Sequence, residues 1–396
     1  MNPLLKNVYH LSETIGPRQC GSDNERQAAR YIEGKLRSLG IPAERQEFLS
    51  IASFSPAQMV IILLSWAGVA LLHWLPPLGF LCGAGALCLF ILEADTRFSI
   101  GQLMPKRQSH NIRGTLNPGR PKRVVITAHM DSSRSGPNFH PKFVKGFRLS
   151  FFLLLASLAI VALGAGWSTV RFLQGAPLPS LWIVYAAAVY LLVVFTTLVL
   201  REVTGQITPG ANDNASGVSV LLETAKTLAG DPPQNLTVEF LATGAEEAGT
   251  FGMIHYLDTV GCENRQFINL DNLGSGELFA VTHEGLLWPF AADQALLTAA
   301  QEAMLTAPTI PAACRRYHLL TTDASAVLAR GGRAVSLMAA DSAGILPNWH
   351  WPTDTFSNVN SENLIRAKKL TVRMIKILDS KLVAQGDLRR VSGGRQ

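Results

Sequence analysis

Three stretches of the chain are apolar without interruption by charge. Residues 59–92 hold no Asp, Glu, Lys or Arg, and Pro76-Pro77 divides them into two segments. Residues 149–167 and 181–200 are also uncharged. An apolar helix of about 20 residues is long enough to cross a bilayer, whereas helices buried in a soluble core usually keep a polar face. The pattern therefore predicts four transmembrane helices, arranged as two inserted hairpins.

The two predicted hairpins differ in how well their helices fit a complete membrane crossing. In the first, residues 56–94, the helix over residues 56–75 would have the length of one hydrocarbon layer, about 30 Å. Its partner over residues 78–94 is shorter and contains three glycines, which permit close helix packing but weaken the case for a complete crossing. The second hairpin, residues 149–200, has no such weakness. Helical hairpins buried in a large soluble core are the alternative interpretation.

The remaining segments show the alternation of an α/β domain. An even number of crossings returns the chain to one side, so residues 1–50, 95–148 and 201–396 are predicted to form one discontinuous domain. Apolar, β-rich runs such as RVVITAH and LTVEFLATG alternate with amphipathic segments such as ERQAARYIEGKLRSLG. This order predicts a doubly wound, largely parallel (mixed) sheet with helices on both faces. Residues 386–396 are predicted to be a disordered tail.

Composition agrees with a soluble part that carries a lipid-facing part. Charged residues make up only 16% of the 396 residues, and the mean hydropathy is +0.20. The net charge is +6, but no Lys/Arg run with interleaved aromatics is present, which argues against a nucleic-acid partner. The partners predicted from composition are therefore a lipid bilayer and whatever the soluble domain binds.

The distribution of positive charge predicts the orientation. Lys and Arg cluster near the span ends on the side of the soluble domain, whereas the opposite turns contain only Arg171. By the positive-inside rule this places the domain in the cytoplasm. Five cysteines without a CxxC pair are read as reduced thiols, and the first residues lack the features of a signal peptide. The prediction is a multi-pass membrane protein with a cytoplasmic catalytic domain.

Polar residues suited to metal binding follow the predicted strands. Ligands in such a fold collect at the carboxyl ends of the strands, and two imidazoles with three carboxylates form a ligand set for two zinc ions. A two-metal site also needs a base that is not itself a ligand. The adjacent pair Glu246-Glu247 can supply both, with Glu247 on metal and Glu246 as base. The residues concerned are His129, Asp131, Asp213, Glu246, Glu247, Asp271 and His350.

Each of these residues, taken alone, has a commoner structural interpretation. A histidine at a strand end is more often a loop residue than a ligand, a Glu-Glu pair is usually a solvated face, and Asp213 in GANDNASG has the features of a helix cap. Their order along the chain and their shared position at strand ends favour the metal site.

The sequence resembles the zinc exopeptidases that include bacterial leucyl aminopeptidase, aminopeptidase Y and glutamate carboxypeptidase. The resemblance lies in five segments that match metal-site motifs: TAHMDSS, GANDNASGVSVLLE, ATGAEEAGTFG, INLDNLGSG and NWHWPTDT. Apart from the four apolar segments, it extends over nearly all of the chain. The resemblance implies two Zn²⁺ ions, one on His129 and Asp271, the other on Glu247 and His350, with Asp213 bridging. It further implies that Asp131 orients His129 and that Glu246 is the general base.

Two positions depart from the family pattern. The family often has a tyrosine just before the last histidine, where it donates to the oxyanion, and this chain has Trp349; an indole N–H can also donate. The segment TTDASAV resembles one that commonly reads Ser-Asp-His, but Ala324 replaces the histidine. Asp323 and Trp349 are therefore candidate substrate or oxyanion residues, and the substrate pocket stays unassigned.

The leading hypothesis is a membrane-anchored dizinc aminopeptidase that hydrolyses N-terminal peptide bonds. A second hypothesis is another zinc reaction on the same scaffold, such as carboxypeptidase action or glutaminyl cyclisation; cyclases hold one zinc, so metal stoichiometry separates the two. A third is a catalytically silent receptor or scaffold. Four spans exceed what an anchor needs, which leaves room for an intramembrane protein partner or a membrane-derived peptide substrate.

Overall fold

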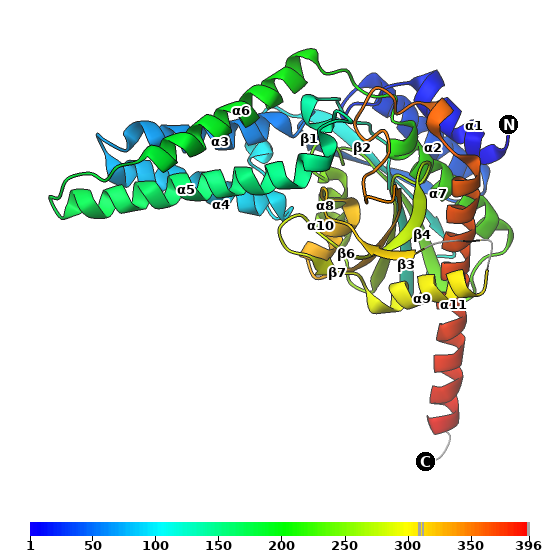
Figure 1. Cartoon of the computed structure of the whole chain (residues 1–396). Coiled ribbons are helices and arrows are strands. Elements are labelled where there is room, and N and C mark those ends of the chain that lie inside the picture. The colour runs from blue at the N-terminus through cyan, green and yellow to red at the C-terminus, as the bar shows by residue number, and fades with distance from the viewer. Residues whose placement is uncertain (308–309, 311–312, 394–396) are drawn as a thin grey trace.

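The structure, a computed structural model, describes residues 1–307, 310 and 313–393 (Figure 1). A mixed sheet with helices on both sides forms one part of the molecule, and four apolar helices extend from it as a separate arm (Figure 1). This arrangement confirms the predicted α/β class with inserted apolar helices.

The sheet is parallel at its centre and antiparallel at its edges. Strands β4, β3, β5 and β9 run parallel, β1 and β2 extend one edge in antiparallel fashion, and β6 continues the other edge antiparallel to β9. The order is β1-β2-β4-β3-β5-β9-β6-β7, with β8 paired to β6. The strands are β1 Ala43–Ser50, β2 Arg107–Leu116, β3 Lys122–His129, β4 Leu236–Thr243, β5 Arg265–Leu270, β6 Glu277–Glu284, β7 Phe290–Ala291, β8 Ala313–Arg316 and β9 Arg333–Ala340.

Central strands bury both faces. Val124 and Ile126 of β3 pack into one hydrophobic cluster, which includes residues of α2, α7, α9 and α11. Val125, between them, packs into another cluster with residues of α8 and α10. Successive side chains of a strand point to opposite faces, so a continuous apolar run is what a two-sided core requires. The helices are α1 Pro3–Tyr9, α2 Asp23–Ser38, α7 Ser216–Gly230, α8 Phe251–Val260, α9 Gln294–Leu305, α10 Asp323–Ala329 and α11 Ser361–Gly393.

The last helix runs through most of the predicted tail. α11 continues to Gly393, although disorder is predicted from residue 386, and residues 394–396 lie outside the described part of the chain. The segment lacks proline, the residue that ends helices most effectively. Disorder of the tail stays a prediction.

The arm consists of α3 Ser55–Leu71, α4 Pro76–Ala94, α5 Phe147–Leu173 and α6 Trp182–Thr204. Three of these helices, α4, α5 and α6, are long and apolar enough to cross a membrane, whereas α3 has 17 residues and is too short by the same measure. The structure thus supports three candidate spans where four are predicted. The chain leaves the helix after Leu71 because Leu75 precedes a proline and adopts a non-helical conformation.

Glycines bring α3 and α4 into close contact. A Cβ on Gly68 would lie 2.9 Å from the carbonyl oxygen of Gly79, and a Cβ on Gly79 would lie 2.9 Å from that of Gly68. Two of the residues in this contact therefore need to lack a side chain. The glycines of residues 78–94 weaken the sequence-based case for a span, but in the structure they allow α3 and α4 to pack closely. The helix that is too short to be a candidate span is α3 and not α4.

Candidate metal centre

The sheet brings the predicted ligands to one edge. His129 is the last residue of β3, Asp271 directly follows β5, and Glu247 lies in the loop after β4. Asp213 lies in the tight turn Ala211–Ala215 before α7. Because β3, β4 and β5 are parallel, their carboxyl ends meet at the same edge. His350, in the loop after β9, completes the group.

The geometry places the carboxylate of Asp213 between the two imidazoles. Its Oδ1 lies 3.1 Å from Nε2 of His129, and its Oδ2 lies 3.2 Å from Nε2 of His350. On one side, Asp271 Oδ1 lies 3.6 Å from the same nitrogen of His129. On the other, Glu247 Oε2 lies 3.0 Å from that of His350. Each oxygen of Asp213 thus faces its own histidine and its own second carboxylate, as a bridging ligand would.

The residues present fit a zinc centre. Their ligand atoms form three groups of mutual separation below 4.8 Å: His129 with Asp213 and Asp271, Asp213 with Glu247 and His350, and His129 with Glu246 and Glu247. Imidazole nitrogens and carboxylate oxygens are ligands that zinc accepts. In addition, Oε1 of Glu247 is buried and has no hydrogen-bond partner among the described residues. A buried oxygen of this kind is costly unless a cation or donor satisfies it.

The surroundings shift the pKa values of Asp213 and Glu246 in opposite directions. Burial opposes ionisation of Asp213, but hydrogen bonds with His129 and His350 outweigh it and hold its pKa well below the ordinary value. Burial raises the pKa of Glu246 well above the ordinary value; the charge of His129 opposes this rise and that of Glu247 adds to it. Asp213 is thus suited to remain an anionic ligand, and Glu246 to accept a proton.

Asp131 supports the loop that carries both glutamates. Its Oδ1 accepts a hydrogen bond from the backbone N–H of Glu246 at 3.2 Å, and its Oδ2 accepts one from Glu247 at 3.1 Å. Nδ1 of His129 lies 3.2 Å from the carbonyl oxygen of Asp131 and 3.5 Å from its Oδ1. Asp131 therefore orients the histidine and the glutamate loop without facing the cavity described below, and it is a positioning residue.

Two further residues support the loops of the site, and neither was predicted from the sequence. Asp354 accepts from the backbone N–H of Asn212 at 2.6 Å and of Asp213 at 3.0 Å. Arg18 is fully buried and donates to the carbonyl oxygens of Met130 and Gly210, among others. Asp354 lies in the motif NWHWPTDT, but the motif does not show that its side chain accepts hydrogen bonds from the Asp213 turn. Nothing in the sequence around Arg18 points to a link between two distant loops.

The candidate substrate residues occupy different places. Trp349 lies beside the site, with its ring centroid 5.0 Å from that of His350 and 5.0 Å from that of Phe139. Asp323 lies behind the sheet edge, where it accepts hydrogen bonds from Thr243 at 2.5 Å and Thr127 at 3.5 Å. Along the cavity, the described lining includes Trp349 but not Asp323. The structure therefore gives Asp323 contacts with the two strands and no direct access to substrate.

Tyr317 is a site residue that no motif indicated. It is buried, it lines the cavity, and burial together with the negative charges of Asp271 and Asp213 raises the pKa of its hydroxyl well above the ordinary value. A phenol can donate a hydrogen bond, so this hydroxyl is a candidate donor at the site.

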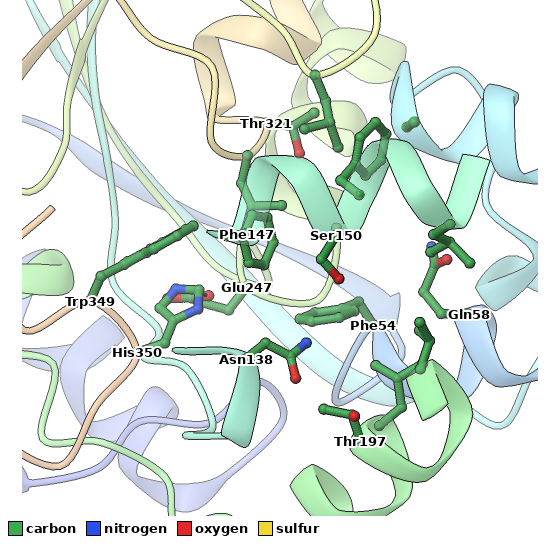
Figure 2. A pocket seen from close by; sticks show the side chains of 18 of the residues that line it. Phe54, Gln58, Asn138, Phe147, Ser150, Thr197, Glu247, Thr321, Trp349 and His350 are labelled. Carbon is green, nitrogen blue, oxygen red and sulfur yellow. Dashed lines mark ion pairs between the residues drawn. The ribbon is translucent and has the colours of Figure 1, made fainter. Parts of the chain in front are cut away.

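A cavity of about 520 Å³ adjoins the cluster. Figure 2 shows Glu247, His350 and Trp349 at one end, with Phe54, Gln58 and Thr197 farther along. The volume lies within the range of small-molecule binding sites. The lining thus joins residues of the α/β domain to residues of the apolar arm.

Comparisons with known proteins agree with this site. Residues 197–375 match Peptidase family M28. Aminopeptidase YwaD of Bacillus subtilis is 28% identical over 181 residues, which cover 42% of this chain and 37% of that protein. The probable lipoprotein aminopeptidase LpqL of Mycobacterium tuberculosis is 36% identical over 81 residues, 19% of this chain and 16% of that protein. The matched region thus spans little more than a third of these relatives at most.

Solved structures share the fold at low sequence identity. BSAP, a zinc aminopeptidase from Bacillus subtilis, has a TM-score of 0.56 at 17% identity and covers 94% of this chain and 93% of that chain. A glutaminyl cyclase from Bacteroides thetaiotaomicron has a TM-score of 0.57 at 15% identity and covers 94% and 96%. These likenesses establish the fold. The chain thus has a zinc aminopeptidase-like fold, and its residues 197–375, a little under half of its length, are similar to peptidase family M28.

Proposed function

We propose that the chain is a membrane-anchored exopeptidase of aminopeptidase type that works with two zinc ions. The observation that carries this proposal is the carboxylate of Asp213, whose two oxygens face His129 and His350 at 3.1 and 3.2 Å. One ion would be held by His129 and Asp271, the other by Glu247 and His350, and Asp213 would bridge them. When bound, zinc lowers the pKa of a water ligand and polarises the carbonyl group of a substrate.

Glu246 is the proposed general base. Its Oε2 lies 3.9 Å from Nε2 of His129, and its side chain lines the cavity. Glu246 accepts the proton of the attacking water and then delivers it to the leaving amine. The backbone of Glu246 is fixed by Asp131, which keeps the carboxylate at the cavity wall.

The scissile carbonyl oxygen needs a hydrogen-bond donor as negative charge develops on it. Tyr317 lines the cavity, and burial together with the negative charges of Asp271 and Asp213 raises the pKa of its hydroxyl. Trp349 instead packs against Phe139 and His350 through its ring faces and edges. We assign the donor role to Tyr317 and a wall of the substrate site to Trp349.

Membrane anchoring rests on the arm. Leu163 of α5 and Val189 of α6 expose 73% and 62% of their surface, and an apolar surface of this extent is unfavourable in water. In a bilayer the same side chains would contact lipid chains, which are equally apolar. The positive charges at the domain end of the arm support a cytoplasmic α/β domain, by the positive-inside rule. A reporter enzyme fused after Gln396 is expected to be active in the cytoplasm; activity on the other side would reverse the orientation.

Glutaminyl cyclisation is the second candidate, because solved cyclases share this fold. Metal stoichiometry separates the two activities: about two zinc ions per chain favour peptide hydrolysis, and one favours a cyclase.

The test uses the full chain purified in detergent. We expect release of the N-terminal residue from short unblocked peptides, loss of this activity on chelation, and recovery on addition of zinc. An N-acetylated copy of the same peptide is the matched control and should remain intact. Turnover of the acetylated peptide from its carboxyl end would indicate a carboxypeptidase. No turnover of any peptide by zinc-loaded protein would favour a cyclase or a silent receptor.

A further inference from the structure

The cavity beside the metal cluster continues into the apolar arm. Its lining includes side chains of all four arm helices, together with the cluster residues. Most of the arm side chains are hydrocarbon or aromatic. They include Phe54 before α3, Phe90 of α4, Phe147, Phe151 and Leu154 of α5, and Val193, Val194 and Leu198 of α6.

Helices α5 and α6 form one wall of the cavity. These two helices diverge as they approach the α/β domain (Figure 1). Ser150 of α5 and Val193 of α6 both line the cavity and are exposed, and Ser150 Oγ lies 2.9 Å from the hydroxyl of Tyr190, which joins the two helices. Because α5 and α6 are candidate membrane spans, the outer side of this wall would face lipid rather than water.

Polar residues within the cavity lining favour a peptide over a lipid tail. Oδ1 of Asn138 and Oε2 of Glu93 are buried and have no hydrogen-bond partner among the described residues. Both residues line the cavity. A hydrocarbon chain would leave these acceptors unsatisfied, which is costly in an apolar environment. The lining also includes the polar residues Gln58, Ser150 and Thr197, and the backbone of an extended peptide needs polar partners of this kind away from water, whereas a hydrocarbon chain does not.

We propose that this cavity receives peptides with an apolar segment that approach from the bilayer, and that α3 to α6 form a substrate compartment as well as an anchor. The inference rests on the proposed aminopeptidase function. An aminopeptidase has a single residue on the amino side of the scissile bond, so the elongated compartment takes the residues on the carboxyl side. The substrate class is therefore peptides whose N-terminal residue is followed by apolar residues, as in fragments of membrane-spanning segments.

Two neighbouring threonines of α6 provide a matched test. Thr197 lines the cavity and is half-buried, whereas Thr196 is exposed and is not among the described lining residues. The full chain, reconstituted in phosphatidylcholine vesicles, would be given two peptides with the same N-terminal alanine. One continues with leucine and valine, the other with serine and glycine. The measured quantity is the ratio of their kcat/KM values.

We expect the unmodified chain to favour the apolar peptide. Thr197→Trp should lower the ratio by about tenfold, since a bulky side chain in an occupied site causes overpacking, whereas Thr196→Trp should leave it unchanged. Equal ratios for all three proteins, with hydrolysis present, would overturn the compartment while leaving the aminopeptidase intact; a lipid chain would then be the occupant. Absence of hydrolysis of either peptide by the zinc-loaded unmodified chain would instead overturn the proposed function, and with it this inference.

Discussion

The α/β domain and the apolar arm distribute polarity in opposite ways. At the sheet edge, charged side chains are buried: Arg18 is 0% exposed and Asp131 is 0% exposed. In the arm, apolar side chains are exposed, as at Leu173, which is 73% exposed. Buried charges persist because each has specific partners, whereas exposed leucines persist when the surrounding solvent is itself apolar.

This contrast shows that one chain is built for two solvents. The polar cluster depends on fixed hydrogen bonds, such as those of Asp354 with the Asp213 turn, and a small displacement there is expected to disturb function. The arm depends on close packing of small residues, such as Gly68 against Gly79, and a small increase in volume there is expected to disturb stability. Perturbations of matched size in the two regions can therefore be compared directly.

The largest effect is expected from Glu246→Gln in the polar cluster. Loss of a general base lowers kcat by about 10²–10⁴-fold, while the proposed ligands stay unchanged, so zinc content should remain near that of the unmodified chain. The measurement is peptide turnover together with metal analysis on the same preparation. Full turnover in the Gln variant would remove Glu246 from the mechanism.

Asp354→Asn is expected to weaken zinc binding by about 10–100-fold, the usual cost of losing a group that orients a ligand. Asp379→Asn is the matched control, because Asp379 also accepts two backbone hydrogen bonds, from Gln234 and Asn235, but supports a different loop. Competition with a chromogenic chelator measures the affinity. Equal losses in the two variants would indicate a general effect on folding rather than support of Asp213.

In the arm, Gly68→Ala is expected to reduce stability by about 1–3 kcal/mol through overpacking. The added Cβ would meet the backbone of α4 at 2.9 Å, whereas a Cβ on Gly85 meets only Leu64, at 3.7 Å. Thermal unfolding in detergent should therefore show a lower midpoint for Gly68→Ala than for the control Gly85→Ala. Similar midpoints for the two would mean that α3 and α4 can separate without cost.

The smallest expected effect is a pH dependence of stability that comes from the buried carboxyl group of Glu284. Burial raises the pKa of Glu284 to about 7, although hydrogen bonds from Thr322 and Ser336 oppose the rise. Between about pH 4.5 and 7 the folded chain thus retains a proton that the unfolded chain releases, so stability falls as pH rises through this window. Glu284→Gln should lessen the fall, and Glu277→Gln, at an exposed position on the same strand, should not. A pH series of denaturant midpoints measures this; parallel curves for all three proteins would exclude the effect.

Short-range patterns predicted much of the fold. The apolar run RVVITAH becomes β3 because a buried parallel strand requires apolar residues on both faces. The strand ends then indicated which polar residues would meet. The structure brings His129, Asp213, Glu247, Asp271 and His350 together, although their assignment as ligands remains a proposal.

Contacts between distant loops could not be predicted in the same way. Arg18 donates to Gly210 across 192 positions, and Asp354 accepts from Asp213 across 141, and neither contact leaves a local periodic signal. Tyr317 was missed because its place in the cavity depends on the path of a loop after β8. The length of α3 was overestimated because hydropathy alone does not mark the turn before Pro76.

The position of His350 after the arm in the sequence has a consequence for biosynthesis. His350 and Asp354 both follow the arm in sequence, and both act on the Asp213 turn. A ribosome must therefore translate all four apolar helices before the second imidazole is available. On the proposed ligand set, a nascent chain halfway through insertion has no complete catalytic centre, so hydrolysis begins only after the whole arm has been synthesised.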